Sequence, residues 1–334
     1  MRWWITLFRK PKSVCTDSDF SATCELIAFQ VVKNIYQILT KYNVCLHETG
    51  SSSKMNDDKK HFRIAILDMY NGFENEGMRC IKKIVTAFGE SESVAVEYTI
   101  FDVRQKLEIP GMNFDAYIST GGPGNPSPVG EPWEKRFFGF LDQIFQFNAN
   151  RHNKTKKHLF LICHSFQMAC IHWQLAGVSK RRKTSFGTFP VHKTALGRKD
   201  PLLNTLSDPF WIVDSRDFQV TQPNQFMLEN MGAKLLCLEK IRPHVPLERA
   251  VMAIRFSKEI VGTQFHPEAD AEGMLRYFLR EDKKVSIIAA HGEAKYNDMI
   301  SHLNDPDKIM MTEAVVIPAF LKNALNKAFL PAYA

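Results

Sequence analysis

The sequence predicts an α/β fold, namely a doubly wound, mostly parallel sheet with helices on both faces and a helical C-terminal extension. Two observations carry this prediction. Short apolar runs typical of buried strands alternate with segments whose apolar residues recur every three or four positions, as in helices. Residues 159–162 are apolar at every position, which is expected of a parallel strand covered on both faces.

The predicted elements follow in the order strand, helix, strand, strand, helix, strand and helix. We expect strands over residues 62–69, 94–103, 116–119 and 159–162, with helices over 74–88, 133–147 and from 166 to about 177. From residue 184 the pattern changes to shorter β-rich segments, over 186–193, 209–214, 233–238, 250–256 and 260–266. A helix over 269–280 closes this unit. Sheets of this kind carry their chemistry at the carboxyl ends of the parallel strands.

The residue pattern divides the chain into three parts. Residues 1–60 are predicted to be an appendage outside the fold, with a helix over 20–44 and a polar linker over 50–60. Met55 in the linker is an alternative start of translation, and a segment that docks onto a membrane or a partner is the other interpretation. Residues 61–282 form the predicted main domain. Residues 283–334 are predicted to be helical and to pack outside the core.

Composition excludes several classes of protein. The seven cysteines are odd in number and show no Cys-x-x-Cys spacing, which argues against a disulfide framework or structural zinc and for a reducing, cytoplasmic compartment. The formal charge is +7, and its densest run, residues 180–183, is expected to be a solvated loop and not a nucleic-acid site. No stretch has the length of a membrane-spanning helix, and no secretory signal is apparent. We therefore expect neither nucleic acid nor a membrane as a partner of the main domain.

Cys163 lies at an abrupt change from the apolar run of residues 159–162 to a helical pattern. This position predicts a nucleophile elbow, in which a strand-to-helix turn exposes a thiol at the edge of the sheet. The amino terminus of the following helix favours the thiolate. The alternative is a buried and inert cysteine, because a single cysteine after an apolar run is commonly part of a core.

Two further motifs follow predicted strands. The glycine-rich loop at residues 120–126 can turn tightly and present backbone N–H groups to an oxyanion, although such a loop can also be a simple turn. The stretch 264–268, Gln-Phe-His-Pro-Glu, places His266 at a strand end and Glu268 two residues later. A thiolate, an imidazole and a carboxylate that orients the imidazole together form a catalytic set for acyl transfer.

These motifs, in this order, resemble those of the class I glutamine amidotransferases. The resemblance rests on Gly-Gly-Pro-Gly at 121–124, on Cys163 with Gln167 four residues later, and on the stretch 264–268, and it spans residues 62–282. It is nearest to the amidotransferase half of GMP synthetase and its stand-alone relatives. It implies a flavodoxin-like α/β fold and an enzyme in which a cysteine attacks the side-chain amide of glutamine, releasing ammonia and leaving a γ-glutamyl thioester.

The resemblance also implies roles for the reactive residues. Cys163 matches the nucleophile, His266 the general acid and base, and Glu268 the residue that orients His266. The backbone N–H groups of Gly122 and His164 would form the oxyanion hole, and the His164 side chain is expected to be a pocket wall.

Gln167 and Ser215 match residues that contact the substrate. The family chemistry needs no cofactor and no metal. The sequence contains no ATP-binding loop of a synthetase, so ammonia that is used would pass to a separate ammonia-accepting synthetase.

The sequence also departs from the family. Leu161 and Ser165 replace the two glycines of the usual elbow, and Phe166 replaces a frequent histidine. Two alternatives therefore stay open beside glutamine hydrolysis. One is a γ-glutamyl hydrolase acting on a larger conjugate, for which residues 242–249 could form a wall of a wider pocket, and the other is a catalytically silent binding or regulatory module. The PfpI-type peptidases share the Cys-His pair but lack the distal His-Pro-Glu.

Overall fold

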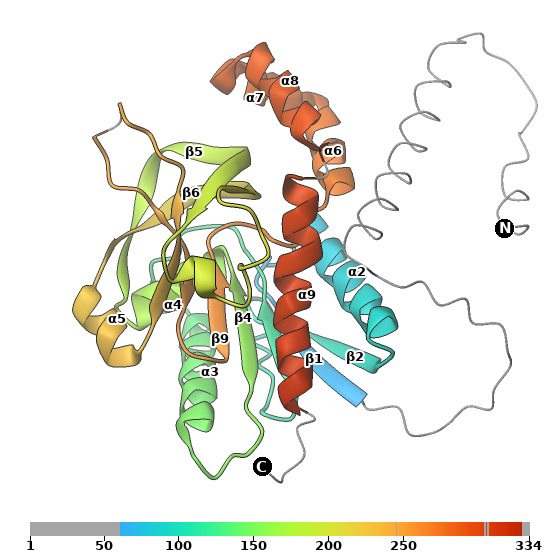
Figure 1. Cartoon of the computed structure of the whole chain (residues 1–334), viewed down its shortest axis with the longest axis vertical. Coiled ribbons are helices and arrows are strands. Elements are labelled where there is room, and N and C mark those ends of the chain that lie inside the picture. Colours follow the sequence, from blue (N-terminus) through green and yellow to red (C-terminus); the bar gives the residue numbers. More distant parts are fainter. Residues whose placement is uncertain (1–60, 245, 304, 306, 329–334) are drawn as a thin grey trace, which may run out of the picture. The chain divides into compact units, whose positions relative to one another are not determined.

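The computed structural model describes residues 61–244, 246–303, 305 and 307–328 of the chain. The helix predicted over 20–44, the linker over 50–60 and Met55 lie outside these residues. The strands are β1 (His61–Asp68), β2 (Ala95–Asp102), β3 (Ala116–Ser119), β4 (His158–Ile162), β5 (Ala176–Lys193), β6 (Phe210–Pro223), β7 (Lys234–Glu239), β8 (Val251–Arg255) and β9 (Ile260–Thr263). The helices are α2 (Glu76–Ser91), α3 (Pro132–Ala149), α4 (His164–His172), α5 (Gln225–Met231), α6 (Ala271–Leu279), α7 (Glu281–His291), α8 (Glu293–Leu303) and α9 (Ile309–Ala328) (Figure 1).

The strands form one sheet in the order β2-β1-β3-β4-β9-β8-β7-β5-β6. Its first five strands are parallel to one another, and we call them the parallel half. The remaining strands pair antiparallel, and we call β8, β7, β5 and β6 the antiparallel half. Strand β9 joins the halves, because it pairs parallel with β4 and antiparallel with β8. The predicted α/β class with a parallel core is confirmed.

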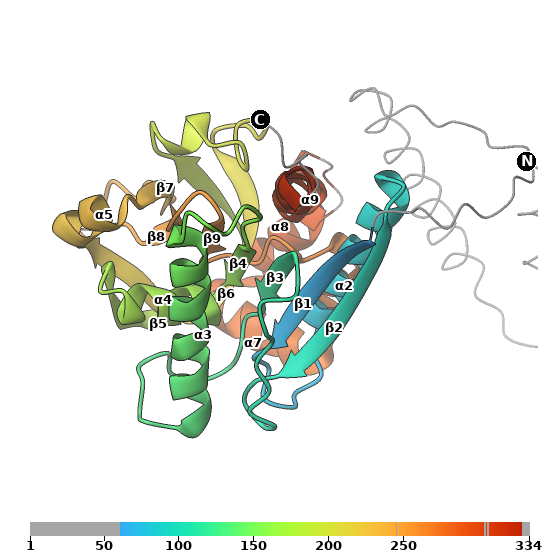
Figure 2. The same ribbon diagram turned by 90° about the horizontal axis from the view of Figure 1, so that it is seen from below.

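Helices cover both faces of the parallel half because successive side chains of a strand point to opposite sides. In β1, Ile64 and Ile66 pack with α2 and α9, whereas Ala65 and Leu67 pack with α3 and α4. Figure 2 shows α3 and α9 on opposite sides of β4. Each buried strand is therefore apolar at consecutive positions, which is the pattern that the sequence carries at residues 159–162.

The C-terminal helix corrects one expectation. Residues 283–334 were predicted to pack outside the core, but α9 lies alongside α2 on the sheet (Figure 1). The ring of Phe320 meets that of Phe160 edge-on with centroids 5.3 Å apart, and Phe320 is buried. The apolar residues of α9 are buried in the same core cluster as those of α2 and β1, which is why the helix packs on this face. Among the described helices, none is both long and apolar enough to cross a membrane.

Two local predictions also need correction. The helix after Cys163 ends at His172 and not near residue 177, because residues from Ala176 onward pair with β6. The basic run 180–183 is not a loop, since it lies within β5 at a shift in register between Lys180 and Ser185, although Lys180, Arg182 and Lys183 are exposed as predicted. The Arg181 side chain is only 13% exposed and forms an ion pair with Glu239.

Candidate active site

Cys163 occupies a sharp turn between β4 and α4, as predicted. Its backbone has φ 48° and ψ −97°, a conformation that costs free energy for any residue other than glycine and is found mainly at functional sites. The turn is held because the Cys163 N–H donates to the Thr263 carbonyl at 2.7 Å, and the Cys163 carbonyl accepts from the Gln167 N–H at 3.0 Å. The residue is 6% exposed.

The two bulky replacements in the elbow are accommodated by different means. Leu161 lies opposite Gly262 on β9, and a Cβ at Gly262 would be 3.1 Å from the Leu161 Cβ and 2.8 Å from Phe166. A glycine on the neighbouring strand therefore makes the room that a glycine at 161 would have made. The Ser165 hydroxyl is buried, where it donates to the Thr120 carbonyl at 2.6 Å and lies 2.7 Å from the Ser119 hydroxyl.

His266 and Glu268 come from the chain that follows β9. The His266 N–H donates to the Val213 carbonyl at 2.9 Å, which ties the residue to β6. Its ring Nδ1 lies 2.8 Å from a Glu268 carboxylate oxygen, and the Glu268 side chain is 1% exposed. A Cβ at Gly121 would lie 2.9 Å from the His266 Cε1 and 3.5 Å from the Cys163 Cβ. The imidazole and the thiol therefore flank the same glycine.

The protonation of His266 follows from these neighbours. Burial lowers the pKa of the imidazole, but the negative charges of Glu268 and of the Cys163 sulfur, with hydrogen bonding to both, raise it well above its ordinary value. An imidazolium beside a sulfur stabilises the thiolate form of that sulfur. The arrangement has the features of a nucleophile paired with an oriented acid and base.

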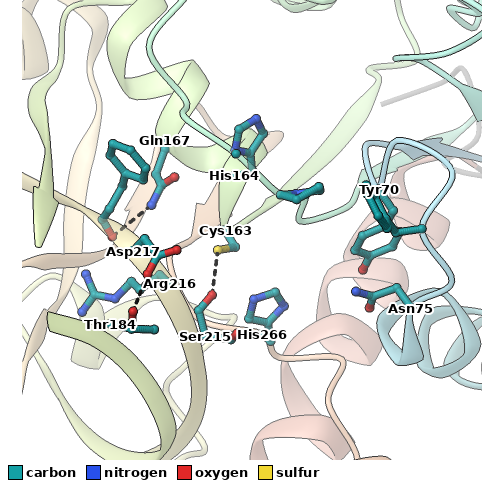
Figure 3. Close-up of a pocket in the computed structure, with 15 residues that line it drawn as sticks. Tyr70, Asn75, Cys163, His164, Gln167, Thr184, Ser215, Arg216, Asp217 and His266 are labelled. Atoms are coloured by element: carbon teal, nitrogen blue, oxygen red, sulfur yellow. Dashed lines mark hydrogen bonds between the residues drawn. The ribbon is translucent and has the colours of Figure 1, made fainter. Parts of the chain in front are cut away.

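These groups face one cavity of about 330 Å³ (Figure 3). Cys163, His164 and Gln167 line one side of it, and His266 and Ser215 lie nearby. The Cys163 sulfur lies 3.8 Å from the Ser215 carbonyl oxygen. All the residues predicted to act in catalysis or substrate binding, except the buried Glu268 that contacts His266, therefore line this cavity.

The predicted oxyanion donors lie at its wall. Neither the Gly122 N–H nor the His164 N–H donates to an acceptor in the described part of the chain. A Cβ at Gly122 would come within 2.4 Å of the Met69 carbonyl oxygen, so this close approach requires glycine. Burial, with a smaller effect of the charge of Arg104, lowers the pKa of the His164 imidazole to about 4, which leaves it neutral near pH 7.

Gln167 is held in place by its side-chain amide. Its nitrogen donates to the Phe218 carbonyl at 3.2 Å and to the Gln264 side-chain oxygen at 3.1 Å. The Gln264 nitrogen in turn donates to the Cys163 sulfur at 3.6 Å. Gln264 was not predicted as a site residue, although it precedes His266 by two positions in the motif that the sequence contains.

Other lining residues were also missed by the sequence. Tyr70 and Asn75 follow β1 and form the wall opposite the hairpin of β5 and β6 (Figure 3), and Phe73 from the same stretch also lines the cavity. On that hairpin, the Thr184 hydroxyl donates to the Asp217 carboxylate at 2.5 Å. The described residues of the range 242–249, which was predicted as a possible wall of a wider pocket, do not line the cavity. Of the hairpin residues only Ser215 was predicted, and no motif marked Thr184 or Asp217, because only the pairing of β5 with β6 brings them to the cavity.

Comparison with known proteins identifies a family and a fold. Residues 65–282 match the family described as glutamine amidotransferase class-I. A solved structure of a glutamine amidotransferase from Thermotoga maritima is 15% identical, with a TM-score of 0.56 over 79% of this chain and 98% of that one. The structure of the protein SMU.1228c is 16% identical, with a TM-score of 0.52 over 79% of this chain and 100% of that one. At these identities the two structures show the fold alone.

No curated protein sequence matches the chain. The family match covers well over half of the 334 residues and includes the elbow, the glycine-rich loop and the His-Pro-Glu motif. The chain therefore belongs to the class I glutamine amidotransferase family.

Proposed function

We propose that the chain hydrolyses the side-chain amide of glutamine, or of a related γ-glutamyl amide, with Cys163 as the nucleophile. The observation that supports this most directly is the meeting of Cys163 and the His266–Glu268 pair at one cavity. These residues are about a hundred positions apart in the sequence. An inert core cysteine has no need of an oriented imidazole beside it.

In the proposed reaction the Cys163 thiolate attacks the amide carbon. The resulting oxyanion accepts hydrogen bonds from the Gly122 and His164 N–H groups, which have no other acceptor in the structure described. The His266 imidazolium gives its proton to the leaving nitrogen, the C–N bond breaks, and ammonia and a γ-glutamyl thioester form. Water deprotonated by His266 then attacks the thioester, which releases glutamate and restores the thiolate.

Substrate binding is assigned to the hairpin of β5 and β6. Asp217 is exposed to the cavity and carries a negative charge suited to the α-ammonium group of a glutamyl substrate. The Ser215 carbonyl lies 3.8 Å from the Cys163 sulfur, and the Gln167 amide is linked to that sulfur through Gln264, so both residues are proposed to contact the rest of the substrate. The resemblance to the amidotransferase half of GMP synthetase supports a separate ammonia-accepting synthetase as the partner.

The test is release of ammonia and glutamate from glutamine and from a panel of γ-glutamyl amines. We expect wild-type turnover and a loss of about 10⁴-fold or more in Cys163→Ala. Cys170→Ala is the matched control, because Cys170 is a buried cysteine of α4 that does not line the cavity. We also expect a glutamine-like diazo-ketone to label Cys163 but not Cys170, as read by mass spectrometry.

The outcomes separate the alternatives. Turnover of a larger γ-glutamyl amine in preference to glutamine would identify a γ-glutamyl hydrolase. A folded protein that neither turns over any substrate nor becomes labelled at Cys163 would instead be a silent binding module, and the proposal would fail.

A further inference from the structure

A second cavity, of about 360 Å³, adjoins the active-site cavity, and Thr184 lines both of them. It lies among β5, β6, the end of β7 and α8. Five of its lining side chains are cationic, namely Arg181, Lys183, Lys240, Arg242 and Lys295. Asp214 and Glu239 are the carboxylates that line it. The net charge of the cavity depends on which cationic groups pair with these two carboxylates.

Asp214 is already neutralised by a buried arginine. The Arg216 Nε donates to both Asp214 carboxylate oxygens at 2.9 Å, and the Ser185 hydroxyl donates to one of them at 2.7 Å. The Arg216 and Asp214 side chains are 1% and 3% exposed. Asp214 is therefore matched by a guanidinium group that does not itself line the second cavity.

Glu239 is shared among three arginines. It accepts from Arg216 at 3.2 Å and from Arg242 at 2.6 Å, and it forms an ion pair with Arg181 at 3.2 Å. Burial raises the pKa of the Glu239 carboxyl, but the charges of Arg216, Arg181 and Arg242 outweigh this and lower it. The carboxylate is ionised, yet the three guanidinium groups outnumber Asp214 and Glu239, so this cluster retains positive charge.

Part of the hydrogen-bonding and charge capacity of the cationic groups that line this cavity is unused. The Arg181 Nε is buried without a hydrogen-bond acceptor among the described residues. Among the residues that the structure describes, no carboxylate forms an ion pair with Lys183 or Lys240. Burial lowers the pKa of Arg181, and the charge of Arg216 lowers it further. A buried donor without an acceptor costs about 1–3 kcal/mol, so a ligand that supplies an acceptor to the Arg181 Nε would be stabilised.

We propose that the second cavity is a binding site for a small ligand that carries phosphate or carboxylate groups. Guanidinium groups bind these anions through two parallel hydrogen bonds, and the lysines at the rim add point charges. The ligand would lie next to the active site, because Thr184 lines both cavities and its hydroxyl donates to Asp217, which lines the Cys163 cavity.

Calorimetric titration of the full chain with pyrophosphate and with citrate tests this proposal. We expect saturable binding of one or both probes, with a Kd below about 1 mM. The variant Lys183→Gln/Lys240→Gln should weaken binding by about tenfold or more, since each substitution removes one charged contact. Lys135→Gln/Lys234→Gln is the matched control, because it removes the same charge from exposed lysines that line neither cavity.

Three results would overturn the proposal. These are the absence of saturable binding of either probe up to about 10 mM, wild-type affinity in Lys183→Gln/Lys240→Gln, and equal weakening in the two double variants, which would indicate unspecific attraction. Preference for pyrophosphate or for citrate tells a phosphate ligand from a carboxylate ligand. The titration needs no turnover, so its result does not depend on the proposed amide hydrolysis.

Discussion

In the parallel half of the sheet, β3 and β4 are buried at every position, whereas β5 and β6 of the antiparallel half contain buried, half-buried and exposed residues. The chain just after the ends of β3, β4 and β9 carries the groups proposed for the chemistry, namely the Gly122 loop, Cys163 and His266. The hairpin of β5 and β6 carries the wall residues Thr184, Ser215 and Asp217. Reactive groups are thus positioned by strands packed on both faces, and substrate contacts by a hairpin that is open to solvent.

The largest effect should come from Glu268→Gln, which tests the parallel half. Without the charge of Glu268 the pKa of His266 should fall, because that charge is what raises it most. We expect kcat to fall about 10⁴-fold, as when the carboxylate of a catalytic triad becomes an amide. Proton NMR titration of His266 and steady-state rates measure the two effects.

Glu272→Gln is the control for this change, because Glu272 lies close by on α6 but is exposed. A tenfold or smaller loss of kcat in Glu268→Gln would show that Glu268 does not orient His266.

The buried histidine of β4 should make the parallel half sensitive to acid. Burial, with smaller effects of nearby cations, lowers the pKa of His158 from 6.5 to about 4. The unfolded chain therefore takes up a proton at higher pH than the folded chain does, and the free energy of unfolding falls as pH drops from 6.5 to 4, by up to about 3 kcal/mol. His158→Leu should remove this part of the decrease in urea unfolding measured at pH 7 and at pH 4.5.

The buried His164 contributes a decrease of the same sign, so some sensitivity to acid should remain. His152→Leu, on an exposed loop, should behave as wild type. An identical pH dependence in His158→Leu and wild type would contradict the assignment.

Gly262 lies on β9, where the two halves meet, and its replacement should loosen the elbow. A Cβ there would press on Phe166 at 2.8 Å and on Leu161 at 3.1 Å. We expect Gly262→Ala to lower the free energy of unfolding by about 1–3 kcal/mol, a usual cost of overpacking a core. Gly139→Ala, on α3 with nothing within 4 Å, is the control.

Leu161→Gly would remove one of the two side chains that a Cβ at 262 would meet. The double variant Leu161→Gly/Gly262→Ala should therefore be less destabilised than the sum of the single variants, as contacting positions are commonly non-additive. Strict additivity would show that Gly262 does not make room for Leu161.

The same division explains what the sequence could predict. The parallel strands and the turn at Cys163 leave a local signal, because a doubly covered strand is a continuous apolar run. The hairpin does not, since the length of β6 and the place of residues 180–183 depend on pairing across tens of residues. The packing of α9 on Phe160 is likewise a distant contact. No local pattern marks Gln264 or Tyr70 as site residues, because only the folded chain brings them next to Cys163 and its cavity. The roles of the site residues stay predictions.

The smallest effect should come from the hairpin, through Asp217→Asn. If the hairpin binds substrate and takes no part in the chemistry, loss of this charge should raise KM for glutamine about tenfold, the loss of one charge-assisted hydrogen bond, with little change in kcat. One Asp217 carboxylate oxygen accepts a hydrogen bond from the Thr184 hydroxyl, so Thr184→Val, which keeps the charge of Asp217, should raise KM less than Asp217→Asn does. Steady-state kinetics of both variants decide the matter. A fall in kcat at constant KM would place Asp217 in the chemistry, and the separation between a reactive parallel half and a binding hairpin would not hold.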